Sequence, residues 1–163
     1  LLVAEAVQKM LSDNLGIYLD LSVTDRVVHF ENAETGKYNF WKDVWLADYY
    51  DPENFLSLFY GKSVPTYSDE PSFPNSTRYK NRSFDTLFEK AIKETDPEKQ
   101  MRMFVQADQK MIDDAPIIPL YYDKTLRLLQ LYVRNLPVNP MEVRDFSTVY
   151  FDYNQSKKMA LLN

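Results

Sequence analysis

Two carboxylates stand close together in an aromatic stretch of the chain, "WLADYYDPENF" (residues 45–55). Asp48 and Asp51 lie among tryptophan, leucine and tyrosine side chains, where an unpaired charge is costly. Each acid therefore needs a structural role, a partner within the chain or a cationic ligand. Two carboxylates that flank a glycosidic bond also perform acid and base catalysis, so a carbohydrate hydrolase is one hypothesis. The stretch supplies too few oxygens, and no glycine in the required place, for a calcium loop.

Asp51 has a structural explanation. It is followed by Pro52 and Glu53, and apolar residues then recur at helical spacing, so we expect Asp51 to cap a helix with proline at its first position. Asp48 has no such role, because it lies in a turn between the end of an expected strand and this cap. From the local sequence, an aspartate that bonds its own backbone and an acid that faces a cleft both remain open.

Motifs for other chemistry are absent from the sequence. Only three glycines are present, which is too few for a P-loop or a dinucleotide fingerprint. His29 is the single histidine and there is no cysteine, so we expect His29 to be structural or on the surface and no zinc or thiolate site to form. No serine stands in a Gly-x-Ser-x-Gly elbow. We therefore expect the protein to bind no metal and no cofactor, and not to be an enzyme.

The composition is that of one globular domain. The chain has 163 residues, 45% of them hydrophobic and 26% charged, with a net charge of -5. This charge, without any run of Lys or Arg, argues against nucleic acid or an anionic membrane as the main partner. Aromatic residues make up 15% of the chain, so we expect some of them to line a surface or cleft.

The first part of the chain alternates between the two kinds of secondary structure. We expect a helix up to Gly16, a half-buried strand at residues 18–24, a helix at 25–34 and a strand at 37–45. Asp25 should cap the second helix, whose valines 27 and 28 and Phe30 should face inward. This pattern is typical of an α/β fold with a parallel sheet. Asp48 then follows the carboxyl end of a strand, where open sheets place their ligands.

The second part begins with a long loop at residues 61–81, which contains three prolines. Loops of this length are often functional. A helix at 84–94 with Ile92 in its apolar stripe follows, and then a helix that Asp96 caps, in which Met101, Phe104, Val105, Met111 and Ile112 are expected to face inward. Strands are expected at 125–133 and 146–151, followed by a tail at 154–163.

The chain opens on "LLVAEAVQKMLSDNLGI", without an initiator methionine. Apolar residues fall on one helical face from the first turn, and polar residues interrupt them too often for a signal peptide or a membrane span. We expect the chain to be a piece of a larger protein, whose targeting segment would lie upstream.

Four blocks of the sequence carry a family resemblance: "YNFWKDVWLADYYDPENFL", "NSTRYKNRSFDTLFEKA", "DPEKQMRMFVQADQKMIDDAPIIPLYY" and "LYVRNLPVNPM". In this order and spacing they resemble the carboxyl-terminal part of the peptide-binding proteins of ABC importers, the oligopeptide- and dipeptide-binding family (extracellular solute-binding protein family 5). The resemblance covers the chain from about Val3 to Phe151. Val44 departs from it, because many members have glycine before the tryptophan.

The resemblance implies a partial class II periplasmic-binding-protein fold, with two lobes that close on a ligand. Residues 1–124 would be the second part of the carboxyl-terminal ligand-binding lobe, and residues 125–163 would cross the hinge and return to the amino-terminal lobe. Apolar side chains after Lys124 would then be left bare. Among them are Leu126, Leu128, Leu131 and Val133.

The resemblance also implies a ligand site. In this family the aspartate of the W-x-A-D motif, here Asp48, pairs with the α-amino group of a bound peptide. Trp45 and Leu46 match the stretch whose backbone pairs with the ligand in strand-like fashion. Lys42 occupies a position where a relative has an arginine that meets a peptide carboxylate, although lysine offers a point charge and not a planar fork. Tyr49, with its neighbours, is a candidate pocket wall.

The implied function is that of an extracytoplasmic solute-binding subunit, which captures short peptides and delivers them to ABC permease subunits. Its location would be periplasmic, free or anchored through a lipid outside this chain. Two alternatives remain: the same fold with another solute, such as a nickel complex, haem or an oligosaccharide, and the carbohydrate hydrolase that would use Asp48.

Overall fold

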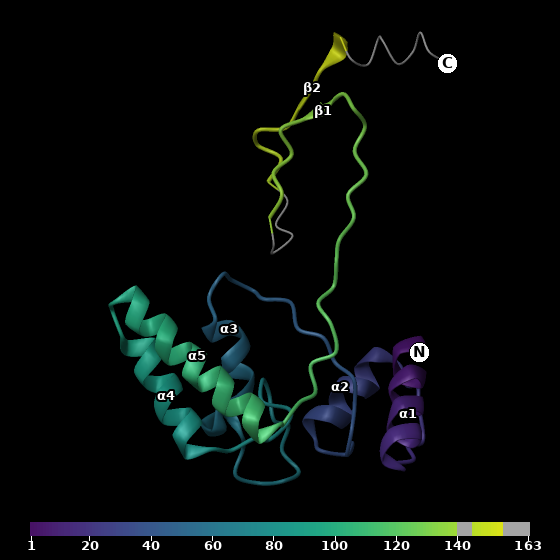
Figure 1. Cartoon of the computed structure of the whole chain (residues 1–163), viewed down its shortest axis with the longest axis vertical. Helices are drawn as coiled ribbons and strands as arrows, with labels where there is room; N and C mark the ends of the chain where they lie inside the picture. The colour runs from purple at the N-terminus through teal and green to yellow at the C-terminus, as the bar shows by residue number, and fades with distance from the viewer. Residues whose placement is uncertain (140–144, 155–163) are drawn as a thin grey trace. The chain divides into compact units, whose positions relative to one another are not determined.

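Figure 1 shows a computed structural model of the chain, which describes residues 1–139 and 145–154. The chain forms two compact units, and each is described by itself. The first comprises Leu1–Trp45 and Asp51–Ile118, and the second comprises Leu46–Tyr50 and the segment from Pro119 onward. The predicted tail falls outside the described residues beyond position 154. Within the described ranges, no helix is long and apolar enough to cross a bilayer.

Two helices open the first unit, α1 (Leu2–Leu15) and α2 (Arg26–Glu34). α1 ends at Gly16, whose φ of 64° is a left-handed conformation that glycine adopts without strain. Asp25 begins α2, because its carboxylate accepts hydrogen bonds from two amides of the first turn. The predicted helix end at Gly16 and the predicted cap at Asp25 are confirmed.

A short helix, α3 (Glu53–Leu56), follows the aromatic stretch and continues into the 3-10 turn η1 (Ser57–Phe59). The carboxylate of Asp51 accepts a hydrogen bond of 2.8 Å from the amide of Glu53. The predicted capping contact is therefore confirmed, although α3 begins at Glu53 and not at Pro52.

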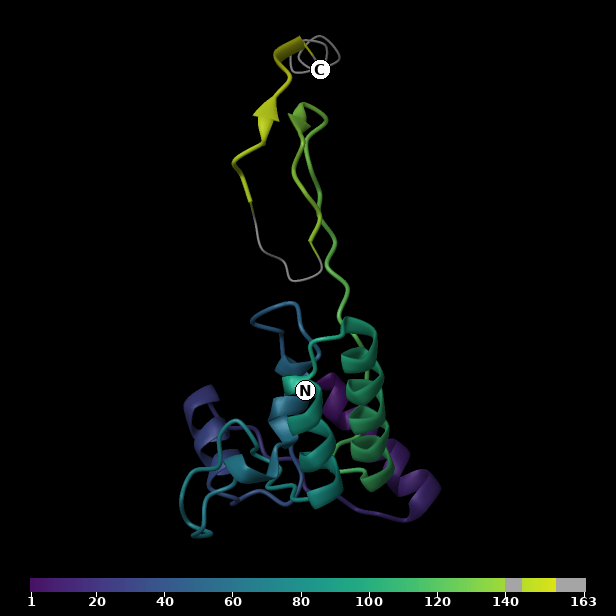
Figure 2. The ribbon, with the colours of Figure 1, turned by 90° about the vertical axis from the view of Figure 1, so that its left-hand side faces the viewer.

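The hydrophobic core lies where α3 and η1 meet two longer helices, α4 (Arg82–Lys93) and α5 (Pro97–Asp114). These two helices lie side by side in both views (Figures 1 and 2). Each presents apolar residues three or four positions apart, which gives it one buried face. Asp96 caps α5 as predicted. The buried core consists of Leu56, Phe59, Phe84, Phe88, Ala91, Phe104, Ala107 and Met111.

Some apolar residues that the helical spacing places inward lie on the surface instead. Ile92, Val105 and Ile112 are 48%, 60% and 40% exposed. Each directly follows a buried residue of its helix, and one step along a helix turns the side chain by about 100°. Met101, Val27 and Val28 are also exposed, at 50%, 76% and 38%. The spacing predicts the helices correctly but overestimates the width of their buried faces.

The two strands expected at residues 18–24 and 37–45 do not form a sheet within the described residues. Side chains form hydrogen bonds to the backbone of these segments. The amide of the Gln8 side chain donates to the carbonyl of Leu19 at 2.6 Å, and the His29 ring bonds the carbonyl of Lys42 at 3.1 Å. A strand exists only when another backbone segment pairs with it. The alternating pattern at residues 18–24 is real, but the described residues pair neither segment with a partner strand.

The second unit contains two short strands, β1 (Val133–Arg134) and β2 (Tyr150–Phe151), which pair antiparallel. They lie inside the expected strands at 125–133 and 146–151 but are much shorter. Before β1 the chain exposes its apolar residues, as predicted. Leu126, Leu128 and Leu131 are 91%, 97% and 64% exposed, whereas Val133, expected to be bare as well, is half-buried and pairs with Phe151.

The loop predicted at residues 61–81 is confirmed, apart from the 3-10 turn η2 (Gly61–Ser63) at its start. It is held against the end of α2. The carbonyl oxygen of Glu34 accepts hydrogen bonds of 2.9 Å from both the amide of Ser72 and the guanidinium of Arg78. The loop is therefore a fixed part of the first unit, despite its lack of regular structure.

Candidate ligand-binding site

Trp45 is the residue of the predicted site whose contacts are best defined. Its indole Nε1 donates a hydrogen bond of 2.8 Å to Oδ1 of Asn54. Its ring centroid lies 6.4 Å from that of Phe73, with the two planes inclined at 49°. Asn54 belongs to α3, and Phe73 belongs to the loop at 61–81. Two separate elements of the first unit therefore hold the indole.

Lys42 is also in the first unit, and its side chain is exposed. Its backbone carbonyl bonds Nε2 of His29, on α2. The ring of His29 further contacts Phe30 and Tyr38, with centroids 5.8 Å and 5.5 Å away. The single histidine therefore has structural contacts, as predicted, and it ties the backbone of the segment before Trp45 to α2.

Leu46, Asp48 and Tyr49 belong to the second unit, and all three are exposed. Asp48 lies in a bend that covers residues 48–51, directly before α3. The predicted position of Asp48 in a turn is confirmed. Its pairing with a ligand, and the roles of Leu46 and Tyr49, stay predictions.

The acids with shifted pKa values have structural partners. A hydrogen bond from Lys62, and one from the Tyr60 hydroxyl, hold the pKa of Glu89 below its usual value. A hydrogen bond from Lys110, and one from the Tyr79 hydroxyl, do the same for Asp114. The contacts of Tyr60 and Lys62 fasten η2 to α4, and the contact of Tyr79 fastens the loop to α5, whereas Lys110 and Asp114 both belong to α5. In the part of the chain that the structure describes, no group of three or more potential metal ligands lies together.

Sequence reasoning missed two residues that the structure places against Trp45. Asn54 had only a weak signal, a polar residue beside the apolar residues of the expected helix, because its burial is visible only in the folded chain. Phe73 had none, because it lies in a loop without periodicity, and only the folded chain brings it to the indole.

Comparison with known proteins identifies relatives. Dipeptide-binding protein DppE of Bacillus subtilis is 30% identical over 140 residues, which cover 85% of this chain and 24% of DppE. The probable deoxycholate-binding periplasmic protein YgiS of Escherichia coli is 28% identical over 129 residues, which cover 78% of this chain and 22% of YgiS. No family model matches the chain.

A solved structure shows the same fold. The periplasmic murein tripeptide-binding protein MppA, in its unliganded open form, matches with a TM-score of 0.74 and 26% identity, over 91% of this chain and 27% of MppA. The chain is homologous to part of these binding proteins. The predicted resemblance to the peptide-binding family and the predicted partial binding-protein fold are therefore confirmed. The relatives are named for binding and not for catalysis, and the chain spans about a quarter of their length.

Proposed function

We propose that the chain is part of an extracytoplasmic solute-binding subunit of an ABC importer, which captures short peptides and does not transform them. The observation that carries this proposal is the 30% identity to a dipeptide-binding protein over 85% of the chain. The likeness to a murein tripeptide-binding protein, over 91% of the chain, supports it. Permease subunits would be its membrane partners. The relatives named as periplasmic support a periplasmic location, with or without a lipid anchor.

In this proposal, residues 1–124 belong to the carboxyl-terminal lobe and residues 125–163 return to the amino-terminal lobe. The bare leucines before β1 support this division, because their apolar side chains suit burial against other strands. The alternation at residues 18–24 supports it too, because this segment has the pattern of a strand that lacks a partner here.

The proposed site uses what all peptides share. Asp48 pairs with the α-amino group, the backbone at Trp45 and Leu46 bonds the peptide main chain, and Lys42 meets the carboxylate. Tyr49 forms part of a pocket wall. A carrier of this kind grips many sequences, because main-chain groups and termini do not depend on the side chains.

The test is a thermodynamic cycle that combines removal of the Asp48 carboxylate with acetylation of the peptide amine, in the complete protein that carries this chain. Asp48→Ala should weaken the binding of trialanine, because truncating one partner of a buried charge pair costs about 2–5 kcal/mol. This corresponds to roughly thirtyfold to several thousandfold in affinity. N-acetyl-trialanine should bind the native protein as weakly, and the variant should hardly distinguish the two peptides.

Asp43 provides the matched control. It is an exposed aspartate of the same segment, and its carboxylate accepts a hydrogen bond from the next backbone amide, that of Val44. Asp43→Ala should leave the preference for the free amine unchanged. Calorimetry on all combinations measures the coupling, and equal binding of free and acetylated peptides by the native protein would remove Asp48 from the site.

A second solute class is favoured by one observation, the 28% identity to a protein named for deoxycholate binding. Native mass spectrometry of the protein purified without refolding separates these two hypotheses from each other and from the carbohydrate hydrolase. Peptides that co-purify support the proposal, whereas a single apolar acid of fixed mass would support a steroid-like ligand. A cleaved sugar would support the hydrolase hypothesis.

A further inference from the structure

The indole of Trp45 is held by a buried amide. Asn54, in the first turn of α3, is only 4% exposed. Burial of an amide is costly unless it forms hydrogen bonds. One of its bonds joins Oδ1 to Nε1 of Trp45 at 2.8 Å. An amide in this position therefore fixes the direction of the indole N–H.

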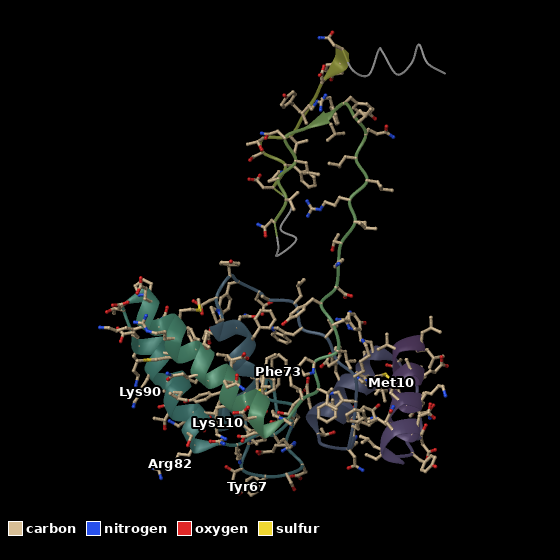
Figure 3. The ribbon with its side chains drawn as sticks, in the orientation of Figure 1. Met10, Tyr67, Phe73, Arg82, Lys90 and Lys110 are labelled. Atoms are coloured by element: carbon tan, nitrogen blue, oxygen red, sulfur yellow. The ribbon has the colours of Figure 1, made fainter. Side chains whose placement is uncertain are left out.

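Phe73 contacts the indole and nevertheless stays open to solvent. Its ring lies 6.4 Å from that of Trp45, but the residue is 63% exposed. Figure 3 shows it on the loop of the first unit, apart from Tyr67 of the same loop. Contact with Trp45 therefore covers only part of the ring. Much of the Phe73 ring is available for another apolar group.

The backbone on both sides of Phe73 is fixed. Ser72 is 0% exposed, donates its amide to the carbonyl of Glu34 at 2.9 Å and donates its hydroxyl to the carbonyl of Asn75 at 2.7 Å. Asn75 is also 0% exposed, and its side chain donates to the backbone carbonyl oxygens of Tyr60 and Tyr79. The exposed ring is thus carried by a backbone anchored one residue before it and two residues after it.

We propose that Trp45 and Phe73 form an aromatic subsite for an apolar or aromatic side chain of the bound peptide, and that Asn54 is a positioning residue for the indole. The proposal rests on the proposed function and adds a side-chain preference to it. A ligand side chain fits better than a docking protein, because two rings offer far less than the roughly 800 Å² per partner of a stable interface. Trp45 also begins the segment proposed to bond the peptide backbone. Rings held in place before binding lose little entropy when a side chain packs on them.

The first experiment compares peptides that differ in one side chain. The complete protein is titrated calorimetrically with trialanine and with the three tripeptides in which phenylalanine replaces one alanine. The native protein should prefer phenylalanine at one position. Phe73→Ala should reduce this preference roughly twofold to tenfold, the range for an aromatic pair. Affinity for trialanine should change by less than about twofold.

Tyr67→Ala is the matched control, because Tyr67 lies on the same loop and is 66% exposed. It should leave the preference for phenylalanine unchanged. The subsite is overturned if Phe73→Ala weakens all four peptides equally, if both loop variants have the same effect, or if the native protein binds all four peptides alike. If the native protein binds none of them, the proposed function fails and the subsite fails with it.

The second experiment tests Asn54 independently of ligand. With 15N-labelled tryptophan, the indole N–H resonance of Trp45 is assigned by its loss in Trp45→Phe. Asn54→Leu, which keeps a similar volume, should move this proton toward the position of a free indole and speed its exchange with water. Asn54→Asp, which keeps the acceptor oxygen, should preserve the native resonance. If Asn54→Leu leaves the indole resonance in place, Asn54 does not position Trp45.

Discussion

Asn75 should be among the most important polar residues for the stability of the first unit. Its buried side chain donates hydrogen bonds of 3.1 and 2.9 Å to the carbonyl oxygens of Tyr60 and Tyr79. It accepts bonds of 3.2 Å from the amide of Tyr79 and 2.9 Å from the hydroxyl of Thr77. A hydrogen bond contributes a net of about 0.5–1.5 kcal/mol, so the four together are worth roughly 2–6 kcal/mol.

Part of this contribution survives in Asn75→Ala. The amide of Tyr79 still has the hydroxyl oxygen of Thr77 at 3.3 Å. We therefore expect the free energy of unfolding to fall by about 2–4 kcal/mol. Asn75→Asp keeps the acceptor but loses both donors, and it places a carboxylate against two carbonyl oxygens. It should destabilise the protein at neutral pH at least as strongly, and less in acid, where the carboxyl is protonated.

The assay is equilibrium unfolding in urea, followed by circular dichroism, with the dependence on urea checked for equality between variants. Asn32→Ala is the control, because Asn32 is only partly buried and donates a 3.3 Å bond to the hydroxyl of Tyr38. It should cost less than about 1 kcal/mol. A loss below about 1 kcal/mol for Asn75→Ala would refute the reasoning, because it would mean that water replaces the amide at no cost.

Three further predictions concern stability. Asp96→Ala should lower the free energy of unfolding by about 0.5–2 kcal/mol, because two first-turn amides of α5 lose their acceptor; an unchanged melting temperature would contradict this. Gly61→Ala should also destabilise, because its Cβ would lie 2.6 Å from a carboxylate oxygen of Asp85, and the double variant with Asp85→Ala should lose less than the sum of the single losses. The hydrogen bond from Lys110 lowers the pKa of Asp114 in the folded protein. This pair therefore stabilises the fold at pH values above the ordinary carboxyl pKa of 3.8, and that stabilisation is lost as the pH falls through the lowered pKa. Lys110→Met should therefore lose less stability than the native protein between pH 7 and about pH 2 in urea titrations, and parallel curves would reject the linkage.

The local sequence determined the helices and their ends. Asp25, Asp96 and Gly16 act within one turn of their own positions, so their roles do not depend on the rest of the fold. The same is true of Asp51, whose contact is with the amide two residues ahead. The family resemblance was also readable, because it rests on blocks of residues in order and not on contacts.

The tertiary structure alone decided pairing and burial. Alternation at residues 18–24 predicts a strand, but strand formation requires a second backbone segment, and periodicity cannot say whether one is present. The exposure of Val105 beside the buried Phe104 depends in the same way on what packs against α5. The partners of Trp45 depend on chain folding as well, because Phe73 is 28 positions away in sequence yet only 6.4 Å away between ring centroids. Contacts between distant segments arise from the packing of whole elements, and no local pattern of residues encodes them.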